Sequence, residues 1–167
     1  MRVRMLIGSL LVLLVAVVVR GQQAAPPPEK ALPAQLNGVT KQILEMAEDF
    51  PAEKYEFKPT PEVRNVREVF VHAMSGTVFA TKTARGENAK WDEIDPATYK
   101  DKAAVVAAFK KAATDLDAAL KALPAARFQA SPQPWVSVIE HTGEHYGQMV
   151  VYYRLNKMVP PASRPKK

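Results

Sequence analysis

The sequence contains no cysteine and few histidines, and these two scarcities limit the chemistry available to it. The absence of cysteine excludes disulfide bonds, thiolate catalysis, zinc fingers and iron–sulfur ligation. Any imidazole chemistry must use the three histidines of the chain, His72, His141 and His145. The 167 residues are otherwise 47% hydrophobic and 24% charged, which is the composition of one ordinary globular domain rather than of a disordered chain.

The first residues have the pattern of an export signal. Arg2 and Arg4 precede an apolar run from Met5 to Val19, which has the length of a signal-peptide core and is short of the roughly 20 residues that a membrane span needs. We expect residues 1–21 to be a signal peptide, or an N-terminal anchor if it is not cleaved, and residues 22–33 to be a proline-rich linker. The protein is therefore predicted to be exported, periplasmic or secreted, and to touch the membrane only through an uncleaved N-terminal segment.

The basic charge of the chain does not indicate a nucleic-acid partner. The net charge of +6 falls to +3 when residues 1–20, with three arginines and no acids, are left out. Several lysines surround one predicted helix, with neither interleaved aromatic residues nor a nucleic-acid-binding motif: Lys100, Lys102, Lys110, Lys111 and Lys121. This pattern is typical of a solvated helix face, and we predict no nucleic-acid partner.

Apolar residues recur with helical periodicity in four segments, which predicts an all-α four-helix bundle over residues 34–164, followed by a basic tail at 165–167. The first segment has apolar residues at spacings of three and four: Leu36, Val39, Ile43, Met46 and Phe50. Pro51 ends it, because proline has no backbone N–H to continue a helix.

The other three helices also carry start and stop signals. Asn65 followed by Glu68 resembles a capping box, and it opens a second helix that runs to about Arg85. The third segment has apolar residues seven apart, at Phe109, Leu116 and Leu123. Pro124 ends this segment, and the fourth helix is predicted from about Trp135 to Asn156.

The link between the second and third helices, residues 85–101, is long for a bundle. A helix of about 19 residues is roughly 28 Å long, and an extended link of about 15 residues spans roughly 50 Å. This link can return along the whole bundle, which would make the second and third helices parallel. Two placements stay open for Trp91 in the link: it covers one end of the bundle, or it fills a crevice under the loop.

The histidines are spaced for metal binding. His141 and His145 are four residues apart on the fourth helix, so both imidazoles lie on one face, within reach of the same ion. His72 is in the middle of the second helix among apolar residues, where a lone histidine is usually a core residue. All three can be placed in the bundle interior together, which predicts a divalent-metal site; zinc and nickel are the metals we expect. Three protein ligands with open positions are typical of a catalytic centre.

The remaining residues of the fourth helix divide into two faces. Gln148 and Tyr152 share the histidine side of a helical wheel and are candidates for lining a substrate pocket. The opposite face is also largely apolar, so a second subunit of a homodimer or the neighbouring loops must cover it: Ile139, Gly143, Tyr146, Val150 and Tyr153.

Glu140 and Glu144 lie on a flank between these faces. Either, and Glu144 first, is a candidate general base or a partner for a histidine N–H, with solvent exposure as the alternative. Residues 141–145 also fit the H-x-x-E-H motif of inverted zinc proteases. No Asp, Glu or His follows His145 to supply the third ligand of such an enzyme, so this match is interpreted as incidental.

Several segments resemble the DinB-like family of bacterial four-helix-bundle proteins: Tyr55–Arg64, Val71–Ala73, Glu140–Gln148 and Tyr152–Arg164. The resemblance extends from about Leu36 to Arg164. It implies a bundle of DinB type with parallel second and third helices, a frequent homodimer, and a divalent metal held by three histidines that match His72, His141 and His145. The family includes thiol S-transferases and relatives of mycothiol-dependent maleylpyruvate isomerase.

Three functions are compatible with these residues. The first is a metal-dependent hydrolase of a small-molecule substrate, because three neutral ligands leave the ion its full +2 charge. The second is a non-catalytic module that binds a metal or a ligand. The third, a thiol S-transferase, is the least favoured, because low-molecular-weight thiols are cytoplasmic cofactors and this chain is expected to be exported.

Overall fold

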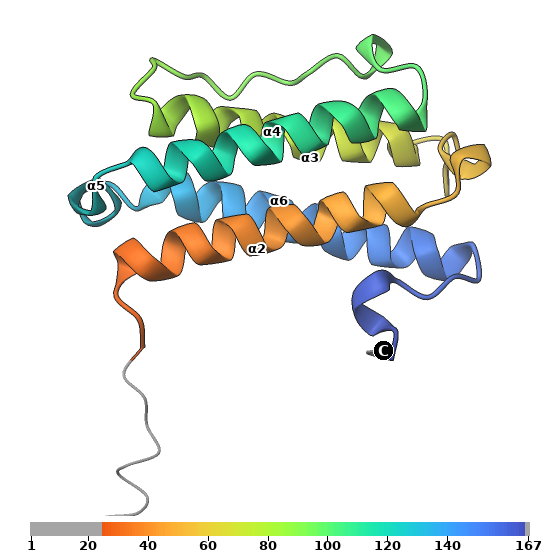
Figure 1. Ribbon diagram of the computed structural model, residues 1–167. Helices are drawn as coiled ribbons and strands as arrows, with labels where there is room; N and C mark the ends of the chain where they lie inside the picture. The colour runs from red at the N-terminus through yellow and green to blue at the C-terminus, as the bar shows by residue number, and fades with distance from the viewer. Residues whose placement is uncertain (1–24, 166–167) are drawn as a thin grey trace, which may run out of the picture.

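Four long helices are arranged as a bundle in the computed structural model, which describes residues 25–165 (Figure 1). They are α2 (Pro28–Asp49), α3 (Val66–Ala84), α4 (Lys102–Ala122) and α6 (Gln133–Leu155). Shorter pieces lie between and after them: η1 (Ala52–Lys54), η2 (Pro96–Thr98), α5 (Ala125–Ala130) and η3 (Pro161–Ser163). The all-α four-helix prediction is confirmed.

The predicted start of the second long helix is also confirmed. The Asn65 side chain accepts a hydrogen bond from the backbone N–H of Glu68 at 2.8 Å, and the Glu68 carboxylate accepts one from the backbone N–H of Asn65 at 2.7 Å. This capping box satisfies two backbone donors that the first turn of α3 leaves without a helical partner.

The link between α3 and α4 returns along the length of the bundle, so these two helices run in the same direction (Figure 1). Helices α2 and α6 run the opposite way. They pack against each other, and in addition α2 packs against α4 and α6 packs against α3. The bundle thus has two parallel pairs, α3 with α4 and α2 with α6. The predicted long link and parallel helices are confirmed.

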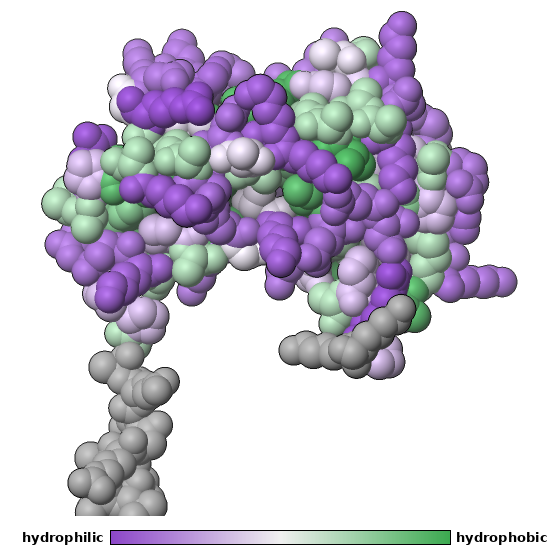
Figure 2. Space-filling model, viewed as in Figure 1, coloured by the Kyte–Doolittle hydropathy of each residue, from purple (hydrophilic) through white to green (hydrophobic). Residues whose placement is uncertain are grey.

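The periodic apolar residues form the core. Ile43, Phe109 and Leu116 are fully buried, and so is Tyr153, which the helical wheel placed on the face opposite the histidines. The Tyr153 hydroxyl donates to the backbone carbonyl of Met46 at 3.0 Å, so α2 covers this part of the face. Hydrophilic residues predominate on the outer face that Figure 2 shows, with apolar patches between them.

Two segments differ from the prediction: the start of the first helix and the loop before the fourth. The first helix begins at Pro28, inside the predicted linker 22–33, because proline suits the first turn of a helix. The loop expected before Trp135 contains α5, whose Phe128 packs on Trp135 with ring centroids 5.4 Å apart. The predicted export signal, residues 1–21, lies outside the described residues. Between residues 25 and 165, no helix combines the length and the apolar character of a membrane span.

Candidate metal centre

The three histidines converge between two antiparallel helices. His72 is on α3, and His141 and His145 lie one turn apart on α6. One ring nitrogen of each histidine lies within 4.8 Å of those of the other two. The Nε2 atoms of His72 and His141 are 3.0 Å apart, and the three ring centroids are 4.5 to 4.8 Å apart. These residues form a cluster that can hold a metal ion.

The donor set fits a divalent transition metal. Zinc–nitrogen bonds are about 2.0–2.1 Å long, so two imidazole ligands of one ion lie roughly 3 Å apart. The Nε2 atoms of His72 and His141 have this separation. At this distance one neutral imidazole can donate a hydrogen bond to the other, whereas a shared metal ion would accept the lone pairs of both.

Burial keeps two of the imidazoles neutral. Desolvation lowers the pKa of His141 to about 4, and the neighbouring His145, His72 and Arg64 act in the same direction. Desolvation also lowers the pKa of His72, with further contributions from Arg64 and His145, while Glu93 opposes the shift. Both rings are therefore neutral at pH 7 and have a lone pair to offer.

A chain of hydrogen bonds holds the third histidine. The Nδ1–H of His145 donates to Oε1 of Gln148 at 2.9 Å, because an amide oxygen can only accept. The Gln148 amide donates to the Tyr152 hydroxyl at 3.1 Å, and this hydroxyl donates to the backbone carbonyl of Arg64 at 2.6 Å. With its proton on Nδ1, His145 has a free lone pair on Nε2 for a metal.

The two residues predicted to line a pocket have different surroundings in the structure. Gln148 lies at the hollow beside His72 and also holds His145. Tyr152 is only 3% exposed, and its hydroxyl acts through Gln148 and the backbone before α3.

Glu144, the predicted general base, lies among the exposed residues of α6. Over residues 25–165 its carboxylate makes no hydrogen bond or ion pair, so the structure does not bring it to the histidines. The acid that contacts the cluster among the described residues is Glu93, whose Oε1 lies 3.1 Å from Nδ1 of His72 and 3.0 Å from Nη2 of Arg64.

No periodic signal in the sequence points to Glu93, because it lies in the irregular link between α3 and α4. The only clue was Trp91, an apolar residue two positions earlier. Its ring stacks on Phe79 at a centroid distance of 4.9 Å and meets His141 edge-on at 4.8 Å. Trp91 therefore fills a crevice beside the histidines and does not cover an end of the bundle.

An open hollow of about 580 Å³ lies beside His72. The charged side chains that line it come from the segment before α3, from its first turn and from the link: Lys58, Glu62, Arg64, Glu68 and Glu93. Glu68 is engaged in the capping box, and Glu93 is paired with Arg64. A small polar molecule has room to approach His72 from this side, whereas His141 and His145 do not line the hollow.

The fold and the cluster define a class of protein, a helical bundle with a three-histidine centre between two helices. Residues 35–152 match the model of the DinB superfamily, and the chain belongs to this superfamily. The matched range contains all three histidines of the cluster. A search of the curated proteins finds none that matches the chain.

Proposed function

We propose that this protein is an exported hydrolase of the DinB superfamily that acts on a small molecule. In this proposal His72, His141 and His145 hold a divalent metal, zinc or nickel. The observation that carries the proposal is the convergence of three imidazoles, two of them held neutral by burial, beside an open hollow. Three neutral protein ligands with positions left over for substrate are the ligand set of catalytic zinc sites.

A bound divalent ion would supply Lewis acidity toward a substrate oxygen. The residues of the chain bind and orient around it. The three imidazoles leave the charge of the ion uncompensated, and Gln148 fixes the ring of His145. Arg64 and Lys58 line the hollow and offer positive charge to a polar substrate group.

The acid–base residue is the part of the proposal with least support in the geometry. Glu144 stays a candidate general base, but it is exposed on α6. Of the three acids that line the hollow, Glu93 and Glu68 already have partners, and Glu62 is exposed to solvent. This shortage of a free acid beside the histidines favours the second candidate function, a non-catalytic module that binds a ligand through its metal.

A hydrolysis screen separates the two candidates. The protein, loaded with zinc or with nickel, is assayed on carboxylic esters, phosphate esters and amides, with His145→Ala as the inactive control. Turnover that a chelator abolishes and that His145→Ala lacks is the expected result. A metal-loaded protein that turns over none of these classes contradicts the hydrolase and leaves the binding module. Thiol-dependent consumption of an electrophile would instead identify the third candidate, a thiol S-transferase.

Export and dimerisation are further parts of the proposal. The basic start and apolar run of residues 1–21 support export, and mass spectrometry of the protein recovered outside the cytoplasm should find this segment missing.

Large apolar side chains exposed on α6 support a homodimer: Val136, Val151 and Leu155. Sedimentation as a monomer at micromolar concentration would contradict the dimer.

A further inference from the structure

The link between α3 and α4 contacts the histidine cluster with two side chains. Trp91 packs on His141, and two residues later Glu93 reaches His72. The contact of Glu93 is made at Nδ1 of His72, away from the Nε2 atom that faces His141. The link is therefore part of the surroundings that decide how these imidazoles are oriented.

The position of Glu93 relative to His72 is that of a carboxylate behind a metal ligand. Its Oε1 lies 3.1 Å from Nδ1 of His72, within ion-pair distance although not at a hydrogen-bonding angle, whereas Nε2 of the same ring faces His141 at 3.0 Å. A carboxylate beside Nδ1 favours the tautomer with the proton on that nitrogen, which leaves the lone pair on Nε2. It also makes the ring a stronger electron donor toward a metal.

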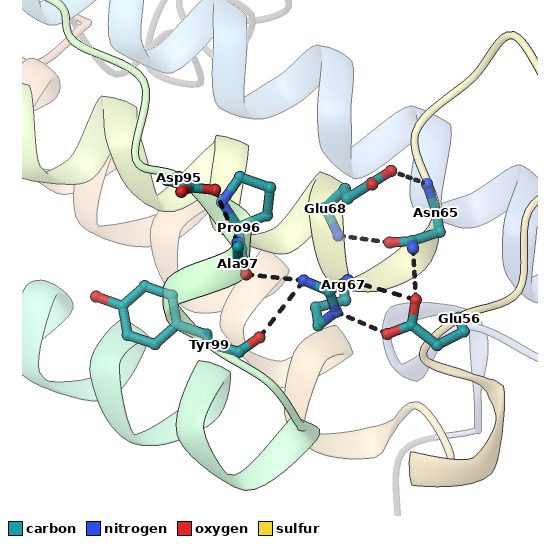
Figure 3. A network of polar contacts seen from close by, with 8 residues as sticks. All are labelled: Glu56, Asn65, Arg67, Glu68, Asp95, Pro96, Ala97 and Tyr99. Carbon is teal, nitrogen blue, oxygen red and sulfur yellow. Dashed lines mark hydrogen bonds and ion pairs between the residues drawn. The ribbon is translucent and has the colours of Figure 1, made fainter.

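The backbone of the link is held to α3 directly after Glu93, at Ile94 and Pro96. The N–H of Ile94 donates to the Ser75 hydroxyl of α3 at 3.0 Å. Further along, Nη1 of Arg67 donates to the carbonyl of Pro96 at 2.7 Å (Figure 3). Arg67 is itself held by an ion pair with Glu56, with Nε and Oε1 at 2.7 Å.

Arg64 shares the carboxylate with His72. Its Nη2 lies 3.0 Å from the same Oε1 of Glu93. The guanidinium draws negative charge away from the imidazole and adds positive charge near the cluster, and both effects oppose a bound cation. Glu93 therefore favours binding of a cation by His72, whereas Arg64 opposes it.

We propose that Glu93 is a positioning residue of the metal centre, which holds the tautomer and orientation of His72, and that Arg64 weakens this effect. The inference rests on the proposed metal-binding function. If it is correct, removal of the Glu93 side chain weakens metal binding and removal of the Arg64 side chain strengthens it. Loss of a contact that only stabilised the fold would not give effects of opposite sign.

The test compares zinc affinity, measured by competition with a chromophoric chelator, across matched variants. Glu93→Ala is expected to weaken binding roughly 10- to 100-fold. Glu93→Gln keeps an acceptor for Nδ1–H and should recover part of the loss. Arg64→Met should bind zinc more tightly than wild type. Asp92→Ala, which removes the exposed neighbouring acid, is the control and should leave the affinity unchanged.

A second measurement distinguishes positioning from folding. The cobalt(II) absorption spectrum reports the ligand field, and it should change in Glu93→Ala and return toward wild type in Glu93→Gln, while circular dichroism stays that of wild type. Zinc affinity of Glu93→Ala equal to that of Asp92→Ala overturns the inference and leaves the metal site intact. Equal weakening by Glu93→Ala and Arg64→Met also overturns it. Wild-type protein that takes up no zinc refutes the proposed function itself.

Discussion

Gly76 lies on α3 at the place where His141 and Trp91 meet. A Cβ atom built there would be 3.0 Å from Nδ1 of His141 and 3.1 Å from a ring carbon of Trp91. The absence of a side chain thus lets the link and α6 close on the same point of α3. Glycine lowers helix stability, so at this position close packing outweighs helix propensity.

We predict that Gly76→Ala lowers the free energy of unfolding by about 1–3 kcal/mol, as overpacking of a core does, and weakens metal binding because His141 must shift. Urea unfolding and zinc competition measure the two effects. Gly143→Ala is the matched control, since no heavy atom lies within 4 Å of its Cβ position on α6. It should raise stability by up to about 1 kcal/mol through helix propensity. Equal behaviour of the two variants would contradict the packing argument.

At the scale of elements, hydrogen bonds of Asn65 tie the start of α3 to the loop before it. Nδ2 of Asn65 donates to Glu56 at 2.7 Å, while its Oδ1 caps the helix (Figure 3). Glu56 also binds Arg67, which holds the link. One polar network therefore orders the helix that carries His72 and the segment that carries Glu93.

We predict that Asn65→Ala lowers the free energy of unfolding by about 1–2 kcal/mol, because both the cap and the bond to Glu56 are lost. Chemical denaturation measures the change. Asn88→Ala, at an exposed asparagine of the link, should change stability by less than about 0.5 kcal/mol. A loss no larger than that of Asn88→Ala would show that the cap contributes little.

The helices and the histidine cluster were predictable because their signals are periodic. Buried residues such as Ile43 and Phe109 repeat at helical spacing, and His141 and His145 share a face for the same reason. The contacts of Glu93 and Trp91 were not predictable in this way. They arise from an irregular segment whose register against α3 is set by tertiary bonds such as that from Ile94 to Ser75.

At the scale of the whole molecule, the C-terminal segment is tied back to α2. Arg164 donates to both carboxylate oxygens of Asp49, at 2.7 and 2.6 Å. The Tyr153 hydroxyl lies 3.0 Å from the same carboxylate. The hydrogen bond from Arg164 is the main cause of an Asp49 pKa below its ordinary value of 3.8.

We predict that Arg164→Ala lowers the free energy of unfolding by about 1 kcal/mol at pH 7, because this surface pair is bidentate but partly solvated. A lowered carboxyl pKa stabilises the fold above the unfolded value and loses this effect as the pH falls through the folded value. The difference between wild type and variant should therefore narrow well below pH 4. Urea unfolding midpoints of wild type and Arg164→Ala, measured at pH 7 and well below pH 4, test this. A difference between the two proteins that grows on acidification would contradict it.

Both the proposed function and the inferred role of Glu93 depend on metal binding by the three histidines. The most direct measurement is the metal content per chain, by inductively coupled plasma mass spectrometry, of protein purified without chelators and then dialysed against zinc or nickel. We predict about one ion per chain for wild type and for Glu144→Gln, whose side chain is exposed, and a small fraction of this for His145→Ala. Wild-type protein without stoichiometric metal, or His145→Ala with the metal content of wild type, would contradict the account.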